Sequence, residues 1–172
     1  MISPNIILGI DPGSVCTGFG FISQQGNHQT YLACGCIRPK AKEMSQRLYE
    51  IYHHLTLLIE KYNPNQVAIE KVFMAKNAQS ALKLGQARGA ALVAAASFNL
   101  PVFEYSPREM KQAIVGYGAA QKEQIQQMIF TLLNLKKKAP KDAADALGVA
   151  ICHASVYHFK LNVNKSRATT HD

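Results

Sequence analysis

Short apolar runs separated by turn residues fill the first forty positions of the chain. Runs rich in β-branched and aromatic residues predict strands at 5–10, 18–23 and 30–38. Pro12-Gly13-Ser14 and Gln25-Gly26-Asn27, which separate them, are typical turn sequences. The first run is apolar at successive positions, which predicts a strand buried on both faces. The short links between the three strands favour antiparallel pairing.

Helical and strand patterns alternate along the rest of the chain. Apolar residues at helical spacing predict an amphipathic helix over 44–62, which Asn63-Pro64 ends. Further strands are expected at 66–70 and 102–105, and further helices at 80–98, 107–115, 121–133 and 142–159. Because helical crossovers join parallel strands, the pattern predicts an α/β fold with one mixed five-stranded sheet flanked by helices.

The chain has 172 residues, a length that suits one domain over 1–160 followed by a polar, disordered tail over 161–172. It shows neither an apolar run long enough to span a membrane nor the pattern of a secretory signal. We therefore expect no membrane association and a cytoplasmic location. Four cysteines, at 16, 34, 36 and 152, lack the spacing of a zinc motif, and Cys34 and Cys36 are expected to be buried thiols on one strand face.

Positive charge exceeds negative charge in this sequence. Nineteen Lys and Arg residues stand against 11 Asp and Glu residues, which gives a net charge of +8 at pH 7. Such an excess favours a polyanionic partner, most often nucleic acid, without establishing one. Lys76, Lys83, Arg88 and the run 136–138 are expected phosphate contacts, which would position DNA without reading its sequence.

Four carboxylates stand at the ends of predicted buried elements. Asp11 follows the first strand, Glu70 ends the fourth, and Asp142 and Asp145 open the last helix. Each has an ordinary structural interpretation as a turn residue, a solvated strand end or a helix cap favoured by the helix dipole. Together, in a basic chain, they predict a cluster whose mutual repulsion a divalent cation would relieve. Ligands that are all oxygen favour Mg²⁺ or Mn²⁺.

Several long blocks of this sequence resemble one nuclease family. The similarity to the RuvC-type Holliday-junction resolvases (crossover junction endodeoxyribonucleases) runs from about Ile6 to His153, in the stretches IILGIDPGS, TGFGFI, AIEKVFMAKNAQSALKLGQARGAALVAA, PVFEYSPREMKQAIVGYG and DAADALGVAICH. The resemblance implies a ribonuclease H-like fold, a homodimer and Mg²⁺-dependent paired incisions in four-way DNA junctions. It also implies a branch-migration motor complex as partner, and 5′-phosphate and 3′-hydroxyl product ends.

The resemblance also assigns roles to individual residues. It implies that the catalytic, metal-binding acids are Asp11, Glu70, Asp142 and Asp145. It places Lys111 and Lys122 on the active-site side and Phe73 beside the junction centre. Lys122 would stabilise charge on the phosphate, and Phe73 would stack on a base. On the residues alone, the favoured interpretations are an ordinary exposed lysine for Lys122 and a loop residue tucked into the core for Phe73.

Other functions compete with this one. The stretch GIDPGSVCTGFG also resembles the phosphate loop of sugar-kinase and actin-like ATPases, which need a second domain for which this chain has no room. A ribonuclease H-like nuclease that acts on RNA and a catalytically silent junction-binding module are the remaining alternatives. The carboxylates disfavour a pure binder, because negative charge that faces phosphates weakens binding.

The helix predicted at 80–98 is the expected dimer interface. Its small residues would let a second backbone approach closely, although they suit packing within one chain as well: Gly85, Ala87, Gly89, Ala90, Ala91, Ala94 and Ala95. Two-fold dimers are the commonest homo-oligomers and would supply two cutting sites. If Ala91 faces outwards, Ala91→Arg is expected to give a folded monomer.

Overall fold

The computed structural model of the chain describes residues 4–71 and 77–168, with side chains up to residue 157. Its elements in chain order are β1 (Asn5–Asp11), β2 (Thr17–Gln25), β3 (His28–Ile37), α1 (Met44–Tyr62), β4 (Gln66–Glu70), α2 (Ala78–Ala96), β5 (Val102–Tyr105), α3 (Pro107–Val115), α4 (Lys122–Leu132) and α5 (Lys141–Ala168). The element types and their order agree with the sequence prediction.

The five strands form one mixed sheet in the order β3-β2-β1-β4-β5. β1 and β2, and β2 and β3, pair antiparallel, whereas β4 is parallel to both β1 and β5. The β2–β3 turn contains Gly26 at φ 61°, a left-handed conformation that glycine adopts without strain. The mixed sheet predicted from the link lengths is confirmed, and β1 is its central strand.

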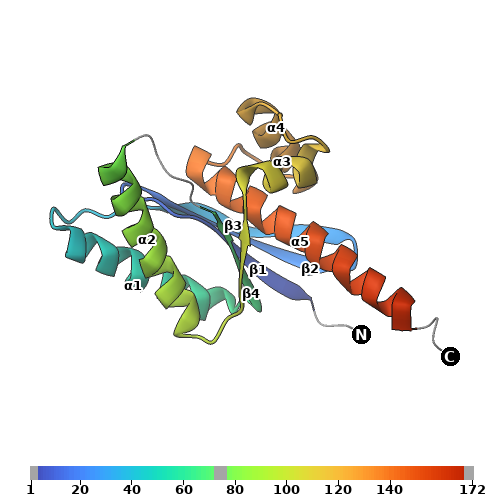
Figure 1. Cartoon of the computed structure of the whole chain (residues 1–172), viewed down its shortest axis with the longest axis horizontal. Helices are drawn as coiled ribbons and strands as arrows, with labels where there is room; N and C mark the ends of the chain where they lie inside the picture. Colours follow the sequence, from blue (N-terminus) through green and yellow to red (C-terminus); the bar gives the residue numbers. More distant parts are fainter. Residues whose placement is uncertain (1–3, 72–76, 169–172) are drawn as a thin grey trace.

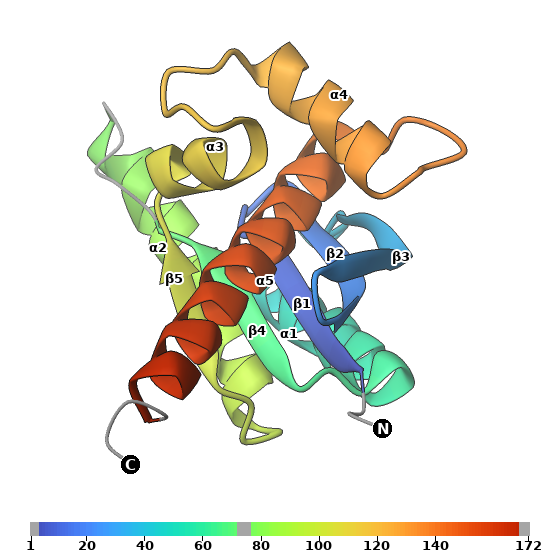
Figure 2. The same cartoon turned by 90° about the vertical axis from the view of Figure 1, so that its right-hand side faces the viewer.

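Helices cover both faces of this sheet (Figure 1). α1 and α2 pack on one face around a core that includes Leu8 and Leu55. α5 crosses the other face with α3 and α4 beside it (Figure 2), around a core that includes Ile7 and Leu147. Ile7 and Leu8 therefore point to opposite faces of the sheet, which explains why successive residues of β1 are apolar.

Glycines in the two central strands let α5 lie directly against the sheet. Gly9 in β1 pairs with Gly20 in β2. A Cβ atom on Gly9 would stand 2.0 Å from the carbonyl oxygen of Ala146, and one on Gly20 would stand 2.7 Å from the Leu147 side chain. The backbone of α5 therefore occupies the space that a side chain at Gly9 would need, and the height of α5 above the sheet depends on this contact.

Gly9→Ala is accordingly expected to destabilise the protein strongly. The added methyl group meets backbone atoms, which cannot rotate away, so we expect a loss of about 3 kcal/mol in the free energy of unfolding. That corresponds to a drop of about 10 °C in Tm, measured by calorimetry. Gly85→Ala is the matched control, because a Cβ on Gly85 in α2 meets nothing within 4 Å. An equal loss in both variants would contradict the close-contact explanation.

Both ends of α5 differ from the prediction over 142–159. The helix begins at Lys141, and Ala144 N–H donates to Pro140 O at 2.8 Å. Asp142 is therefore the second helical residue rather than the N-cap. The helix continues to Ala168 and so enters the segment predicted as a tail from 161 onward, and residues 169–172 lie outside the described part. A helix that packing has already nucleated can extend through polar residues on propensity alone.

The α2 helix places its small residues mostly inwards. Ala87, Ala91, Ala94 and Ala95 are buried, and Ala91 is only 1% exposed. The condition for the Ala91→Arg test is thus not met, because Ala91 packs within the chain. The helix also begins at Ala78 rather than at residue 80, since Asn77 caps it by accepting from Gln79 N–H at 2.9 Å.

No helix in the described part of the chain has the length and apolar character needed to cross a membrane.

Candidate active site

Two neighbouring strand ends and the start of a helix bring carboxylates together. Asp11 is the last residue of β1, and Glu70 is the last residue of β4, which runs parallel beside it. Because parallel strands end at the same edge of a sheet, the two side chains become neighbours. Asp11 also pairs with Gly18 of β2, and α5 begins above that glycine, where a Cβ atom would stand 2.0 Å from the Asp142 carbonyl oxygen. The first turns of α5 are therefore held at this edge.

The Asp11 carboxyl resists ionisation in this environment. Burial and the charge of Glu70 raise its pKa from 3.8 to about 8, and Asp145 and Asp142 contribute further repulsion. Protonated Asp11 donates a hydrogen bond to Glu70. Burial and Asp145 also raise the pKa of Glu70, while the bond from Asp11 and the charge of Lys122 lower it. The site thus holds more negative charge than it can stabilise alone.

Lys122 supplies the positive charge within this site. It is the first residue of α4, and its Nζ lies 2.5 Å from Oδ2 of Asp145, whose side chain is 14% exposed. Gln121 N–H donates to the Gln124 side chain at 3.0 Å, which fixes the first turn of α4 and thereby the direction of Lys122. Lys122 is therefore an ion-pair partner of a site carboxylate rather than an isolated surface lysine.

The other predicted contact residues are spread over the molecule. Lys111 is a partly buried residue of α3, and Lys83 is exposed on α2. Arg88 binds Glu104 of β5 at 2.5 Å, so a carboxylate already neutralises its charge. Residues 136–138 line a pocket beside the start of β3. Phe73 and Lys76 lie outside the described residues. The roles of all these residues as DNA contacts stay predictions.

The donor atoms at the strand ends suit a hard divalent cation. Asp11, Glu70 and Asp145 offer only carboxylate oxygens. Burial and mutual repulsion raise the pKa values of Asp11 and Glu70, although Lys122 pairs with Asp145. No three of the four acids, however, bring their oxygens within 4.8 Å of one another among the described residues. A cation would therefore draw the side chains closer as it binds.

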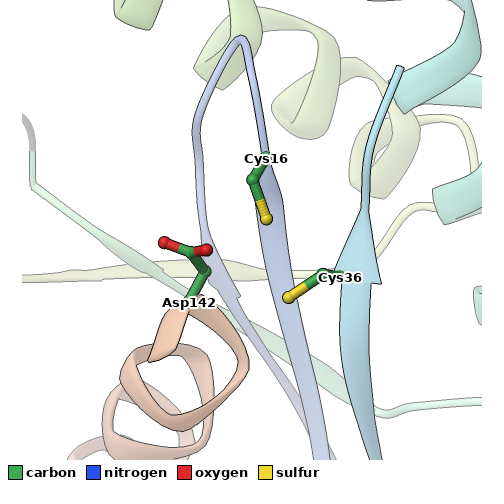
Figure 3. A group of neighbouring side chains, drawn as sticks. All are labelled: Cys16, Cys36 and Asp142. Atoms are coloured by element: carbon green, nitrogen blue, oxygen red, sulfur yellow. The ribbon is translucent and has the colours of Figure 1, made fainter. Parts of the chain in front are cut away.

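A second set of ligand atoms, which the sequence analysis did not find, adjoins the first. Within the described residues, one group of three brings its ligand atoms within 4.8 Å of one another: Cys16, Cys36 and Asp142 (Figure 3). Cys34 and Cys36 are partly exposed, so the prediction that they are buried thiols is wrong. The sequence carries no direct signal for this group, because the pairing of Cys36 with Gly18 depends on a register shift between Phe21 and Ile22.

Comparison with known proteins gives a family match over most of the chain. Residues 7–153 match the family model described as crossover junction endodeoxyribonuclease RuvC. A protein of that name from Shewanella sp. (strain W3-18-1) is 60% identical over 89% of this chain and 87% of its own length. One from Histophilus somni is 55% identical over 95% of this chain and 87% of its own. The solved structure of Thermus thermophilus RuvC in complex with Holliday junction substrate superposes with a TM-score of 0.86, at 32% identity, over 91% of this chain and 96% of that one.

Proposed function

Because this chain belongs to the RuvC family of crossover junction endodeoxyribonucleases, we propose that it resolves four-way DNA junctions by metal-dependent hydrolysis at the Asp11–Glu70–Asp145 site. Its fold is the ribonuclease H-like fold that the sequence resemblance implies. The observation that carries the proposal is the electrostatic coupling of three carboxylates from β1, β4 and α5. Such a role in junction resolution belongs to homologous recombination and DNA repair.

The family uses a divalent metal, and Mg²⁺ is the ion that the oxygen donors favour, with Mn²⁺ as a substitute. Asp11, Glu70 and Asp145 would hold it, and Asp142 stands next to them at the helix start. Two bound ions would neutralise the phosphate and lower the pKa of an attacking water. Asp11 must lose the proton that it shares with Glu70 before it can act as a ligand, so the protein's own carboxylates couple cation binding to proton release.

The hydrolysis itself is a simple exchange of bonds at phosphorus. A water oxygen adds to the phosphorus and gives up a proton, the bond from phosphorus to the 3′ oxygen breaks, and that oxygen takes up a proton. The products are a 5′-phosphate and a 3′-hydroxyl. Lys122, held 2.5 Å from Asp145, keeps that carboxylate in place and lends positive charge to the side of the site where the phosphate would lie.

A cleavage assay tests the proposal directly. We expect a synthetic four-way DNA junction to be cut in Mg²⁺ and left intact in its absence, and to be cut in preference to duplex DNA and to an RNA–DNA hybrid. Preference for the hybrid would favour a nuclease that acts on RNA. Tight junction binding without any cleavage would favour the silent binding module.

Lys122→Ala is expected to impair turnover more than binding. The change removes the ion pair with Asp145 and a positive charge within the site, so we expect kcat to fall by about 100-fold. Junction affinity should change far less, because many other basic residues contribute to it. The matched control is Lys61→Ala, which removes an exposed lysine from the last turn of α1 and should leave kcat and affinity unchanged. Equal losses in kcat and affinity would instead identify Lys122 as a simple phosphate contact.

Assembly into a homodimer is part of the proposal. The outward side of α2 exposes Leu82 and Val93, at 69% and 59%, and Gly85 and Gly89 between them leave open space. We infer that a second copy of the chain covers this side, because symmetric cuts need two sites related by a two-fold axis. The proposal also includes a branch-migration motor complex as a further partner. It places the protein in the cytoplasm, as expected for an enzyme of cellular DNA.

A further inference from the structure

Cys16, Cys36 and Asp142 converge on one face of the sheet, above Gly18. Cys16 precedes Gly18 by two residues, and Cys36 is the cross-strand partner of Gly18, so both thiols share its face. The first turn of α5 covers the same glycine, since a Cβ atom there would stand 2.0 Å from the Asp142 carbonyl oxygen. The residue before β2, the end of β3 and the start of α5 thus place two sulfurs and a carboxylate together (Figure 3).

We propose that Cys16, Cys36 and Asp142 form a binding site for one thiophilic divalent cation, Zn²⁺. Their ligand atoms all lie within 4.8 Å of one another. In a tetrahedral site with Zn–S bonds of about 2.3 Å, neighbouring sulfurs stand about 3.8 Å apart, so small side-chain movements close the site. Two thiol protons leave to solvent as the thiolates bind, no oxidation state changes, and water completes the fourth position.

This site differs in chemistry from the carboxylate site beside it. Thiolates select Zn²⁺ over Mg²⁺, whereas the oxygen donors of Asp11, Glu70 and Asp145 suit Mg²⁺. Asp142 belongs to both groups, because its charge acts on Asp11 and its side chain accepts a hydrogen bond from the Cys16 thiol. Zn²⁺ bound through the thiols would hold the Asp142 carboxylate away from the catalytic ions. The site is therefore an inhibitory one, a consequence that rests on the proposed function.

Binding is tested with Co²⁺, which replaces Zn²⁺ and reports its ligands by absorption. The full chain, kept reduced with a phosphine, should take up one equivalent and show thiolate-to-cobalt charge-transfer bands with the intense visible bands of a tetrahedral ion. Zn²⁺ should displace it. The double variant Cys16→Ser, Cys36→Ser should bind more than about 100-fold more weakly, since loss of even an indirect partner of a metal ligand costs 10- to 100-fold.

Cys34→Ser is the matched control, because Cys34 is a partly exposed thiol of the same strand outside the group of three. It should keep the spectrum of the unaltered chain. Missing thiolate bands in the unaltered chain, or bands that persist in the double variant, would overturn the site.

The inhibitory role is measured separately by junction cleavage in Mg²⁺. One equivalent of Zn²⁺ should lower the rate about tenfold or more in the unaltered chain and in Cys34→Ser, and should leave the double variant uninhibited. Thiolate bands without inhibition would overturn the inhibitory role alone. Absence of cleavage in Mg²⁺ without Zn²⁺ would overturn the proposed function, and the cobalt spectra would still decide whether the site exists.

Discussion

Asp11→Asn should abolish junction cleavage while junction affinity stays equal or increases. An amide cannot replace the central carboxylate as a cation ligand, so we expect a loss on the order of 10⁴-fold in cleavage rate, as for other essential catalytic groups. Affinity for DNA comes from basic residues, and asparagine, like the protonated acid, places no negative charge against the phosphates. Cleavage rates and gel-shift titrations measure the two effects. Equal loss of both would indicate a structural role for Asp11.

The same variant should be more stable than the unaltered chain at pH 8 without metal. In the folded chain the pKa of Asp11 is raised from 3.8 to about 8, so above about pH 4 the folded chain keeps a proton there that the unfolded chain releases. The free energy of unfolding therefore falls as the pH rises from about 4 to 8. Asparagine resembles the protonated acid, since its amide can donate to Glu70 and carries no charge. We expect Tm to rise by several degrees at pH 8 and to change little near pH 4.

The matched control for both measurements is Glu60→Gln, which removes an exposed acid of α1 remote from this edge of the sheet. It should leave cleavage and the pH dependence of Tm unchanged. A stability gain in Asp11→Asn that is the same at pH 4 and pH 8 would contradict the electrostatic explanation.

A mixed dimer with one Asp11→Asn subunit should nick a supercoiled cruciform plasmid and seldom linearise it. Each chain carries one carboxylate site, so two incisions in one junction need two intact copies. The two copies can be separated by different affinity tags, and gel electrophoresis distinguishes nicked from linear plasmid. Efficient linearisation by the mixed dimer would contradict the paired-site arrangement.

The surface through which the two copies meet can be tested in the same assay. Val93→Arg places a charge on the outward side of α2 without disturbing the core, because Val93 is 59% exposed. We expect a folded monomer in sedimentation that has lost paired cutting. Val15→Arg is the control, since Val15 is 71% exposed but lies outside α2. Full paired cutting by a chain that sediments as a monomer would contradict the dimer.

The parts of the fold that local chemistry determines could be predicted from the sequence. The bounds of α3 were predicted without error, because Ser106 and Glu109 form a capping box at its start and Gly116 ends it at φ 84°. The carboxylates were found for a similar reason, since a charged residue at the end of an apolar strand is visible in the sequence itself.

The remaining features depend on contacts between distant segments. Nothing in the sequence of α2 shows that Ala91 faces inwards, because that depends on how the helix rests on the sheet and α1. The pairing of Arg88 with Glu104 requires the α2–β5 geometry. The thiol group was missed because it requires the β2–β3 register and the position of α5 together.

The position of α5 after all five strands of the sheet has a consequence for synthesis of the protein in the cell. A growing chain that has reached residue 140 already carries Asp11 and Glu70, but it lacks Asp145 and the helix that covers one face of its sheet. Such a chain has neither a complete site nor a closed core. A complete carboxylate site therefore forms only when α5 docks, after all five strands have been synthesised. We expect a product truncated before α5 to leave junction DNA uncut.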